Sequence, residues 1–515
     1  PRGTAIEVGH AEDLKDGRPW IYKMVLVHAG ERQVARGGRS RMETFCPRGF
    51  RYLQLGVRGH KRAVKIRRVG IVTHRYPHVQ RGAFACSDPL FTDLWEMGWK
   101  TLRLCSEDVY TDCPWRERTL YAGDLLVEFA TALVTSGDTM LARRCLEIFI
   151  QSQSEQTDWQ QSMAPVRRDG TPLVDYPLIT LLASEWYVRV TGDRDFAGKS
   201  YPLFRRMMER ARSFREENGL YRSAVKPFVD HVQQLKDGQV IALNALVAGS
   251  FAAFARWATG IGEKRDAAIY RRLACEAGQA VRRLGWDARK GAFADALVNG
   301  KRADGFAMAS SNWPSFFGLT APAQERALRR YFRERTAEPP GAGRQTCCTP
   351  YGAFYHLGGL YEHGHEDLAE DFIRRYWGPM HAAGSDTVYE DFGPEHSMTH
   401  AWSSAPTYYL STRALGVRMG LPDATRLDGI LIAPQSETLA WAEGVVPHPR
   451  GEVRVAWRIE GGRLVVDVCV PAGVRWRVEP VGRLARLKLH ICAGSGMSKA
   501  KPAARYREIW ACRCR

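Results

Sequence analysis

Residues 241–260 read IALNALVAGSFAAFARWATG, and this stretch indicates the fold class of the whole chain. Its apolar side chains recur at three- and four-residue spacing over a wide face, which predicts a helix enclosed by other elements. At least ten segments repeat this spacing, and each ends at Gly, Asp or Pro. Two further examples are LLVEFATALVT (125–135) and PTYYLSTRALGVR (406–418). About twelve such helices most simply form a barrel of hairpins, because no consensus of roughly 34–45 residues recurs as an α-solenoid would require.

The two ends of the chain have a different pattern. Near the N-terminus, alternating runs such as RYLQLGVRG (51–59) and AVKIRRVGIVTH (63–74) are separated by Gly-rich breaks, which is typical of β-strands. Alternation returns after Leu427, where EGG joins two runs as a hairpin turn would. The chain starts Pro-Arg-Gly without a Met, so we expect its N-terminus to be cut from a longer protein. The predicted parts are a partial β-sandwich over 1–82, a helical barrel over 83–424, a β-sandwich over 425–483 and an irregular basic tail over 484–515.

Composition excludes several classes of function. The chain has 515 residues and a net charge of +18, but its Lys and Arg residues are scattered, so we expect no nucleic-acid partner. No uninterrupted apolar run reaches the length of roughly 18 residues that a membrane span needs, so we expect no membrane partner. The twelve cysteines form no CxxC pair, and we expect them to be reduced, several of them buried. Neither a cofactor nor a metal is predicted, a homodimer is left open, and a cytoplasmic location is slightly favoured over a periplasmic one.

Three acids gather in YTDCPWRERTLYAGD (110–124), a notable concentration in a basic chain. Pro114 suits the first position of a helix, which would leave Asp112 in the loop before it and Glu117 in its opening turn. Asp124 precedes an apolar run and would suit the N-cap of the next helix. The spacing alone therefore leaves two interpretations open, ordinary caps and ion pairs or a site where carboxylates carry out chemistry.

A second polar stretch favours the chemical interpretation. Residues 384–411 read GSDTVYEDFGPEHSMTHAWSSAPTYYLS, a long aromatic-rich loop that leads into a late helix. Aromatic faces beside carboxylates suit sugar rings, which need flat apolar stacking and hydroxyl acceptors. The residues of interest in this loop are Glu390, Asp391, Glu395, His396, His400 and Trp402.

DCPWRERTLYAGD (112–124) resembles the signature of the family-78 glycoside hydrolases, the α-L-rhamnosidases. HAWSSAPTYYLS, TPYGAFYHLGGLYEHG, RRYWGPM and PRGFRYLQL are also similar to segments of that family, in the same order along residues 1–483. The resemblance implies a six-hairpin α/α barrel, as the catalytic domain, between an N-terminal and a C-terminal β-sandwich. It also implies an inverting exo-hydrolase that releases terminal α-L-rhamnose from a plant glycoside or polysaccharide.

The resemblance also assigns roles to single residues. Glu117 matches the general acid and Glu390 the general base, while Asp112 and Asp124 match acids that hold rhamnose. Two residues depart from the family pattern at the expected sugar-binding subsite. Tyr121 stands where the family usually has Trp, and Trp115 replaces a commonly polar residue. The remaining candidates for substrate binding are Arg116, Asp175, Asp230, Trp313, His400 and Trp402.

Each of these candidates has a structural alternative. Asp175 and Asp230 could equally hold a turn or cap a helix, Trp313 could belong to the core, and His400 could brace its loop. We expect Glu390 to be ionised, and Glu117 to keep its proton while Arg116 and Arg118 point away from it or pair with other acids. Two other functions stay open, an α/α-barrel hydrolase for another sugar and a non-catalytic carbohydrate-binding homologue.

Overall fold

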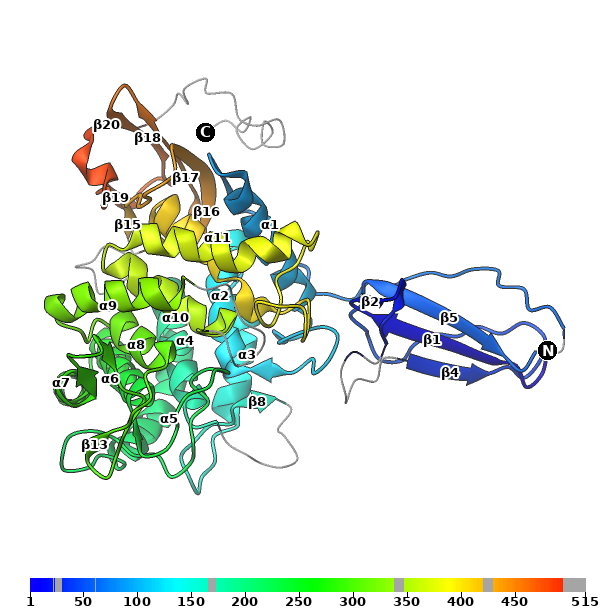
Figure 1. Ribbon diagram of the computed structural model, residues 1–515, viewed down its shortest axis with the longest axis horizontal. Coiled ribbons are helices and arrows are strands. Elements are labelled where there is room, and N and C mark those ends of the chain that lie inside the picture. Colours follow the sequence, from blue (N-terminus) through cyan, green and yellow to red (C-terminus); the bar gives the residue numbers. More distant parts are fainter. Residues whose placement is uncertain are drawn as a thin grey trace.

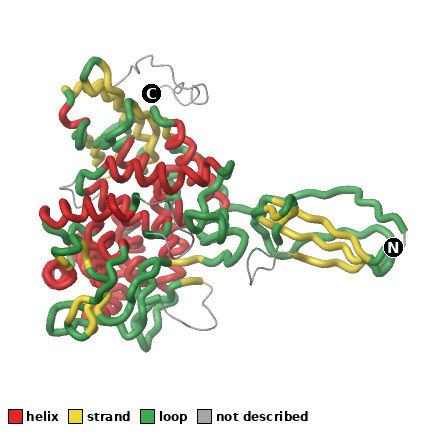
Figure 2. Tube along the Cα trace, viewed as in Figure 1, coloured by secondary structure: helices red, strands yellow, loops and turns green. Residues whose placement is uncertain are grey.

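The computed structural model has three parts along the chain (Figure 1). A large helical body lies in the middle, strands near the C-terminus cover one end of it, and an N-terminal arm of strands projects from its side. Coloured by secondary structure, the body is built mainly of helices joined by loops, and the arm is strand and loop (Figure 2). The structure describes residues 1–21, 23, 30–60, 62–164, 173–337, 347–419 and 429–493.

Among the described residues, six helices form a closed inner ring in which each packs against the next and the last packs against the first. Nearly all of their residues are buried, and in the first of them every residue from Ala122 to Thr135 is buried. A helix that is apolar on all sides must be enclosed, and these helices are the ones whose sequences are apolar around a wide face. The inner helices are α2 (Ala122–Thr135), α4 (Tyr176–Thr191), α6 (Ile241–Ile261), α8 (Met308–Phe316), α10 (Pro350–Glu362) and α12 (Ala405–Tyr409).

In the part of the chain that the structure describes, six more helices surround this ring and alternate with it along the sequence. They are amphipathic, so that one face covers the inner ring and the other carries charged residues to the solvent. The twelve helices therefore make a six-hairpin α/α barrel, which confirms the predicted fold class. The outer helices are α1 (Pro89–Leu104), α3 (Met140–Gln151), α5 (Arg194–Arg212), α7 (Lys264–Ala280), α9 (Pro322–Arg335) and α11 (Glu366–Ala382).

Helix α6 is long and apolar enough, by length and composition, to cross a membrane. Its most apolar window is 89% buried inside the protein, where it packs between its ring neighbours α4 and α8 and against the outer helix α7. We therefore assign α6 to the core of the barrel, since the inner helix of a large helical fold has this same composition.

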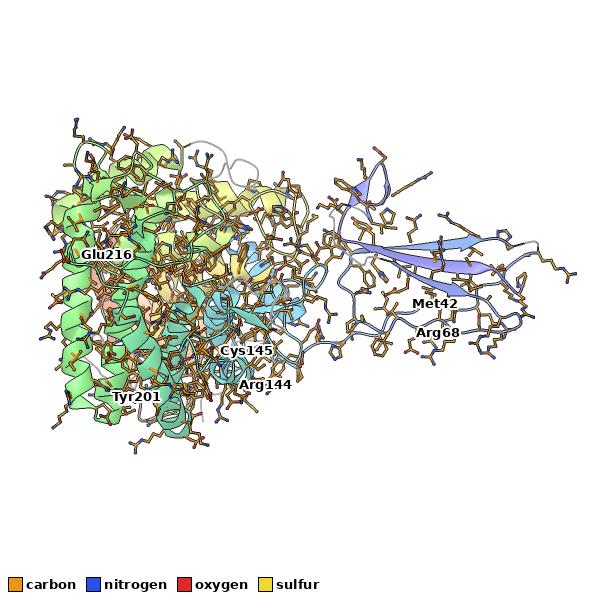
Figure 3. The ribbon with its side chains drawn as sticks, turned by 90° about the horizontal axis from the view of Figure 1, so that it is seen from below. Met42, Arg68, Arg144, Cys145, Tyr201 and Glu216 are labelled. Carbon is orange, nitrogen blue, oxygen red and sulfur yellow. The ribbon has the colours of Figure 1, made fainter. Side chains whose placement is uncertain are left out.

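The N-terminal arm contains a three-stranded antiparallel sheet in the order β4-β1-β5. The strand predicted over 63–74 is wrong, because this segment pairs with no strand in the described part of the chain. Its alternating apolar residues face solvent, with Val72 87% exposed, since alternation makes a strand only where a partner offers backbone hydrogen bonds. Met42 and Arg68 mark this arm in the view from below, and Cys145 marks α3 in the body (Figure 3). The strands are β1 (Ala5–Ala11), β2 (Leu14–Lys15), β3 (Arg18–Pro19), β4 (Gly30–Val34) and β5 (Tyr52–Arg58).

Two sheets form the C-terminal part, one of five strands (β20-β18-β17-β16-β6) and one of three (β14-β15-β19). The predicted irregular tail over 484–515 is wrong for its first residues, because Lys488–Ala493 pairs in parallel with Arg463–Cys469. Residues 494–515 of that predicted tail lie outside the described residues. The strands are β6 (Ala83–Cys86), β14 (Val417–Met419), β15 (Gly429–Ile432), β16 (Trp441–His448), β17 (Gly451–Glu460), β18 (Arg463–Cys469), β19 (Arg475–Val478) and β20 (Lys488–Ala493).

The N-terminal ends of the inner helices meet at one end of the ring. Tyr121, before α2, contacts Tyr176 at the start of α4, with ring centroids 6.4 Å apart. Tyr351, at the start of α10, stacks on Trp402 before α12 at 5.3 Å. Both motif-bearing loops therefore lie at this end.

Short elements complete the connections: β7 (Leu120–Tyr121), β8 (Met163–Ala164), β9 (Gln239–Val240), β10 (Trp286–Asp287), β11 (Ala292–Phe293), β12 (Ala296–Val298), β13 (Lys301–Arg302), π-helical turns at Val281–Gly285 and Leu410–Ala414, and 3-10 turns at Ala401–Ser403 and Leu484–Arg486.

Candidate active site

Asp112 and Thr119 hold the two ends of the loop before α2 together by two hydrogen bonds. The Asp112 N–H donates to the Thr119 carbonyl at 3.0 Å, and the Thr119 N–H donates back to Asp112 Oδ1 at 2.8 Å. The predicted helical turn over Glu117 is wrong, because the chain reverses here through Arg118 at φ 49° instead of continuing a helix. The loop therefore holds Arg116 and Glu117 at its tip, while Asp112 is buried at its base.

Asp124 is not the N-cap of α2, which corrects the sequence prediction. The cap residue is Tyr121, and Asp124 lies inside the first turn of the helix. Its side chain turns to the late loop, where Asp124 Oδ1 lies 2.9 Å from His400 Nε2. Burial raises the pKa of the Asp124 carboxyl, and His400 opposes that rise.

Arg116 joins the two candidate catalytic carboxylates. Its Nη2 lies 2.7 and 2.6 Å from Oε1 and Oε2 of Glu390, and its Nη1 lies 3.4 Å from Glu117 Oε1. The Glu117 side chain is 37% exposed, whereas that of Glu390 is 4% exposed. Arg118 pairs with Glu107 as expected, but the expectation that Arg116 avoids Glu117 is only half met, because Arg116 contacts both acids. The Glu117 carboxylate is thus partly exposed to solvent and the Glu390 carboxylate is buried, and the Arg116 guanidinium contacts both.

Glu390 is held in its ionised form. Its Oε2 accepts the Ser397 N–H at 3.2 Å, and its backbone carbonyl accepts Trp402 Nε1–H at 2.8 Å. Burial by itself would raise the pKa of Glu390, but His400 and the positive charge of Arg116 outweigh it and hold the pKa well below its usual range. This agrees with the expectation that Glu390 is ionised.

His400 connects the early and late motifs inside the protein. Its Nε2 meets Asp124 at 2.9 Å, and its Nδ1 lies 3.7 Å from Glu390 Oε2, which is an ion-pair distance and too long for a hydrogen bond. Its ring lies over Trp402 with centroids 4.4 Å apart. Burial lowers the pKa of His400, but the two carboxylates more than reverse that effect and raise the pKa well above its usual value. The side chain is therefore an imidazolium between two acids.

Aromatic rings form the floor beside these acids. The Tyr121 ring contacts Tyr176, the Tyr351 ring contacts Trp402, and Tyr176 and Tyr351 both contact Phe228, with ring centroids 5.6 and 6.0 Å away. Burial raises the pKa of Tyr121, and a hydrogen bond between its hydroxyl and Glu117 adds to this effect. Gly123 must be glycine here, because a Cβ at this position would lie 2.9 Å from Tyr176 and 3.2 Å from Tyr351.

Trp115 and Trp313, two of the three tryptophans that the sequence singled out, are buried. Trp115 is 3% exposed, and its Nε1–H has no hydrogen-bond partner in the described part of the protein. Trp313 is buried in α8 and stacks on Tyr355 at 3.7 Å, and Tyr355 in turn contacts Tyr351 at 5.5 Å. Trp313 thus supports the aromatic floor from behind.

Asp175 and Asp230 use their oxygens within the protein. Asp175 accepts the backbone N–H groups of Phe228 and Val229 at 2.9 and 2.7 Å. Asp230 accepts the Thr349 hydroxyl at 2.5 Å, and burial raises its pKa to about 6. These contacts are those of residues that hold the loops before α6 and α10, which is the structural alternative named for both.

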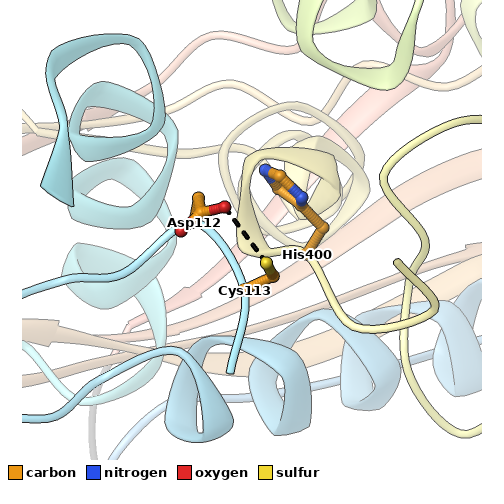
Figure 4. A group of neighbouring side chains, drawn as sticks. All are labelled: Asp112, Cys113 and His400. Carbon is orange, nitrogen blue, oxygen red and sulfur yellow. Dashed lines mark hydrogen bonds between the residues drawn. The ribbon is translucent and has the colours of Figure 1, made fainter. Parts of the chain in front are cut away.

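Asp112, Cys113 and His400 place three side-chain atoms of metal-ligating type within 4.8 Å of one another (Figure 4). The Cys113 thiol donates to Asp112 Oδ2 at 3.0 Å, and burial raises the pKa of the thiol well above its usual value. The His400 ring nitrogens face Asp124 and Glu390, so the thiol and the imidazole are both engaged within the protein. These three residues carry no proposal of a metal centre.

The sequence matches two family models over most of the barrel and the C-terminal strands. The bacterial alpha-L-rhamnosidase 6 hairpin glycosidase domain matches residues 79–414, and the bacterial alpha-L-rhamnosidase C-terminal domain matches residues 428–487. The chain belongs to the bacterial α-L-rhamnosidase family. No curated protein sequence matches it.

Solved structures of rhamnosidases have the same fold. The GH78 family rhamnosidase of Bacillus sp. GL1 is 26% identical, with a TM-score of 0.85 over 97% of this chain and 52% of that one. The Streptomyces avermitilis α-L-rhamnosidase complexed with L-rhamnose is 19% identical, with a TM-score of 0.74 over 93% and 46% of the two chains. The Klebsiella oxytoca rhamnosidase with rhamnose bound is 20% identical, with a TM-score of 0.63 over 80% and 82%. This rhamnosidase-family chain thus spans about half the length of the Bacillus and Streptomyces proteins.

Tyr176 and Tyr351 are buried next to the candidate site of this rhamnosidase-family chain and were not among the sequence candidates. Each is the first or second residue of an inner helix, Tyr176 directly after Asp175 and Tyr351 in the segment TPYGAFY. The only sign of these two residues in the sequence is that each stands at the start of an apolar helix. That position indicates proximity to the site only when the starts of the inner helices meet at one end of the ring, which the tertiary structure determines.

Proposed function

We propose that this chain is an inverting glycoside hydrolase that releases terminal α-L-rhamnose from plant glycosides or polysaccharides. The observation that carries the proposal is the placement of Glu117 and Glu390 on either side of the Arg116 guanidinium. Inverting hydrolases keep their two carboxyl groups roughly 6.5–9.5 Å apart so that a water fits between the sugar and the base. Two acids separated by one guanidinium are consistent with that spacing.

Glu117 is the general acid in this proposal. Its partly exposed side chain stands where a leaving group attached to a terminal sugar would reach solvent, while Glu390 is enclosed. Glu117 gives its proton to the glycosidic oxygen as the bond from that oxygen to the anomeric carbon breaks. The aglycone departs as a neutral alcohol through the open side.

Glu390 is the general base. Its ionised carboxylate takes a proton from a water while the water oxygen bonds to the anomeric carbon from the opposite face, which inverts the configuration. Arg116 and His400 keep Glu390 ionised before the reaction.

The floor supports a small deoxysugar as the substrate. The partly exposed Tyr121 ring beside Glu117 offers a flat apolar surface, which suits a ring face or the methyl group of rhamnose, and it packs on the buried Tyr176 ring. Family membership supports the same sugar, because the matching domain is that of the bacterial α-L-rhamnosidases.

A panel of aryl glycosides, with NMR detection of the anomer first released, tests the proposal. We expect p-nitrophenyl α-L-rhamnoside to be the preferred substrate and β-rhamnose to appear before mutarotation. Release of the α-anomer first would overturn the inverting mechanism. Cleavage of a different aryl glycoside in preference would identify a hydrolase for another sugar, and binding without release would identify a carbohydrate-binding homologue.

A further inference from the structure

Glu12 belongs to the N-terminal arm, yet it is buried against the late active-site loop. It lies in the connection between β1 and β2, and its side chain reaches Ser397 and Met398. The Met398 N–H donates to Glu12 Oε2 at 2.8 Å, and the Ser397 hydroxyl lies 3.2 Å from the same oxygen and 3.4 Å from Oε1. Only 4% of Glu12 is exposed. A carboxylate from outside the barrel thus binds two consecutive residues of the loop that carries Glu390.

Ser397 is also the residue that holds Glu390. Its N–H donates to Glu390 Oε2 at 3.2 Å, and its carbonyl accepts the Glu390 N–H at 2.9 Å. A displacement of Ser397 would therefore move the backbone and the carboxylate of the base together. In this chain of hydrogen bonds, Ser397 is the single residue between Glu12 and Glu390.

The same arm contacts the loop that carries the general acid. The Gly49 N–H donates to the Pro114 carbonyl at 2.9 Å, and Arg118 Nη1 donates to the Pro47 carbonyl at 2.9 Å. A Cβ at Gly49 would lie 2.6 Å from the Pro114 backbone, so the two segments are in close contact. The N-terminal arm is therefore attached to both active-site loops at once.

The burial of Glu12 has a cost that its loop contacts offset. Burial raises the pKa of Glu12, and the Met398 N–H and the Thr399 and Ser397 hydroxyls oppose that rise. The nearby Lys23 pairs with Asp13, 3.2 Å away. The hydrogen bonds that compensate Glu12 are thus the ones that fix residues 397 and 398.

We propose that Glu12 is a positioning residue of the active site, which fixes Ser397 and thereby the Glu390 carboxylate, so that the N-terminal arm is part of the catalytic unit. This inference rests on the proposed role of Glu390 as the base. It predicts that the position of Glu390 depends on a hydrogen-bond acceptor at residue 12 and not on the arm's surface charges.

The test compares Glu12→Ala and Glu12→Gln in the full chain with Glu7→Ala as the matched control. Glu7 lies in the same region, on β1, and pairs with Arg32 and Arg58 on the arm's own sheet. We expect Glu12→Ala to lower kcat by about 10- to 100-fold with little change in KM, because a displacement of about 1 Å costs this much in rate. The amide oxygen of Glu12→Gln can still accept from Met398 and Ser397, so kcat should recover to within a few-fold of the wild type. Glu7→Ala should keep the wild-type kcat.

Hydrogen–deuterium exchange supplies a readout that does not need activity. Peptides spanning residues 388–400 should exchange faster in Glu12→Ala than in the wild type, and Glu12→Gln should restore their protection. Wild-type kcat in Glu12→Ala, an equal loss in Glu7→Ala, or unchanged exchange of these peptides would each overturn the inference. If the wild type hydrolyses no glycoside, the proposed function fails, and the exchange experiment still decides whether Glu12 fixes the loop.

Discussion

The Arg116 guanidinium lies 2.6 and 2.7 Å from the two carboxylate oxygens of Glu390, although the two residues come from the first and the last loops of the helical ring. A buried carboxylate is stable only when it is paired and hydrogen-bonded, and this contact supplies the nearest positive charge. Nη1 of the same guanidinium lies 3.4 Å from Glu117 Oε1. Arg116 therefore fixes where the two carboxylates lie relative to each other.

Replacing Arg116 should change the acidic limb of the pH profile. Arg116→Met removes a charge that lowers the pKa of Glu390, while burial still raises it. The pKa of Glu390 should therefore rise, and the acidic limb of kcat/KM should move to higher pH by about one unit or more. Arg116→Lys keeps the charge and should move the limb less. An unchanged limb in Arg116→Met would show that Glu390 does not control it.

Both candidate catalytic acids should be indispensable. Glu117→Gln and Glu390→Gln keep the size of the side chain but remove proton transfer, so each should lower kcat by at least about 10²-fold. Circular dichroism should show an intact fold in both variants. The exposed Glu395, in the same late loop as Glu390, provides the matched control, and Glu395→Gln should retain wild-type kcat. Full activity in either of the first two variants would remove that residue from its assigned role.

His400 should contribute to stability in a pH-dependent way. Its folded pKa is raised above the usual value of about 6.5, so its contribution is fully present below that pH and is lost as the pH rises through the folded pKa. His400→Asn removes a charge between two buried acids and should lower the free energy of unfolding by about 3–5 kcal/mol at pH 6. Urea denaturation between pH 6 and pH 9 should show this difference shrinking as the pH rises. A constant difference would mean that the imidazolium is not what stabilises the pair.

Gly123→Ala should damage the aromatic floor without unfolding the barrel. The new methyl group would meet Tyr176 at 2.9 Å and Tyr351 at 3.2 Å, so Tyr176 must shift and Tyr351 must give by a few tenths of an ångström. We expect kcat/KM to fall by about 10-fold or more, since small displacements of substrate-positioning groups have large effects on rate. Gly198→Ala, on the outer helix α5 with open space around its Cβ, should leave activity unchanged. Wild-type kinetics in Gly123→Ala would show that the positions of these buried rings do not affect substrate binding or catalysis.

The helical barrel could be predicted from the amino-acid pattern because its physical cause is local. Helices such as Ile241–Ile261 are apolar around a wide face, and such a helix must be enclosed. The two loops that carry Glu117 and Glu390 could be predicted for a similar reason, since acids and aromatic residues between apolar helices are visible as composition. The C-terminal strands followed from alternation alone, although β20 was taken for part of an irregular tail.

Local spacing did not predict the shape of the loop around Glu117. Pro114 suited a helix start, but the chain turns at Arg118 because Asp112 and Thr119 hydrogen-bond across the loop. A backbone conformation that depends on such a closure cannot be read from the spacing of residues.

The contacts that organise the site are made between segments far apart in the chain. His400 lies between Asp124 and Glu390, and Glu12 reaches Ser397 from the N-terminal arm. The amino-acid sequence contains these residues but gives no local sign that they meet, because their proximity arises from closing the ring of helices and docking the arm. The residue types and the helical fold thus follow from local chemistry, whereas the charge states and the positions of the acids exist only once the tertiary structure has buried and paired them.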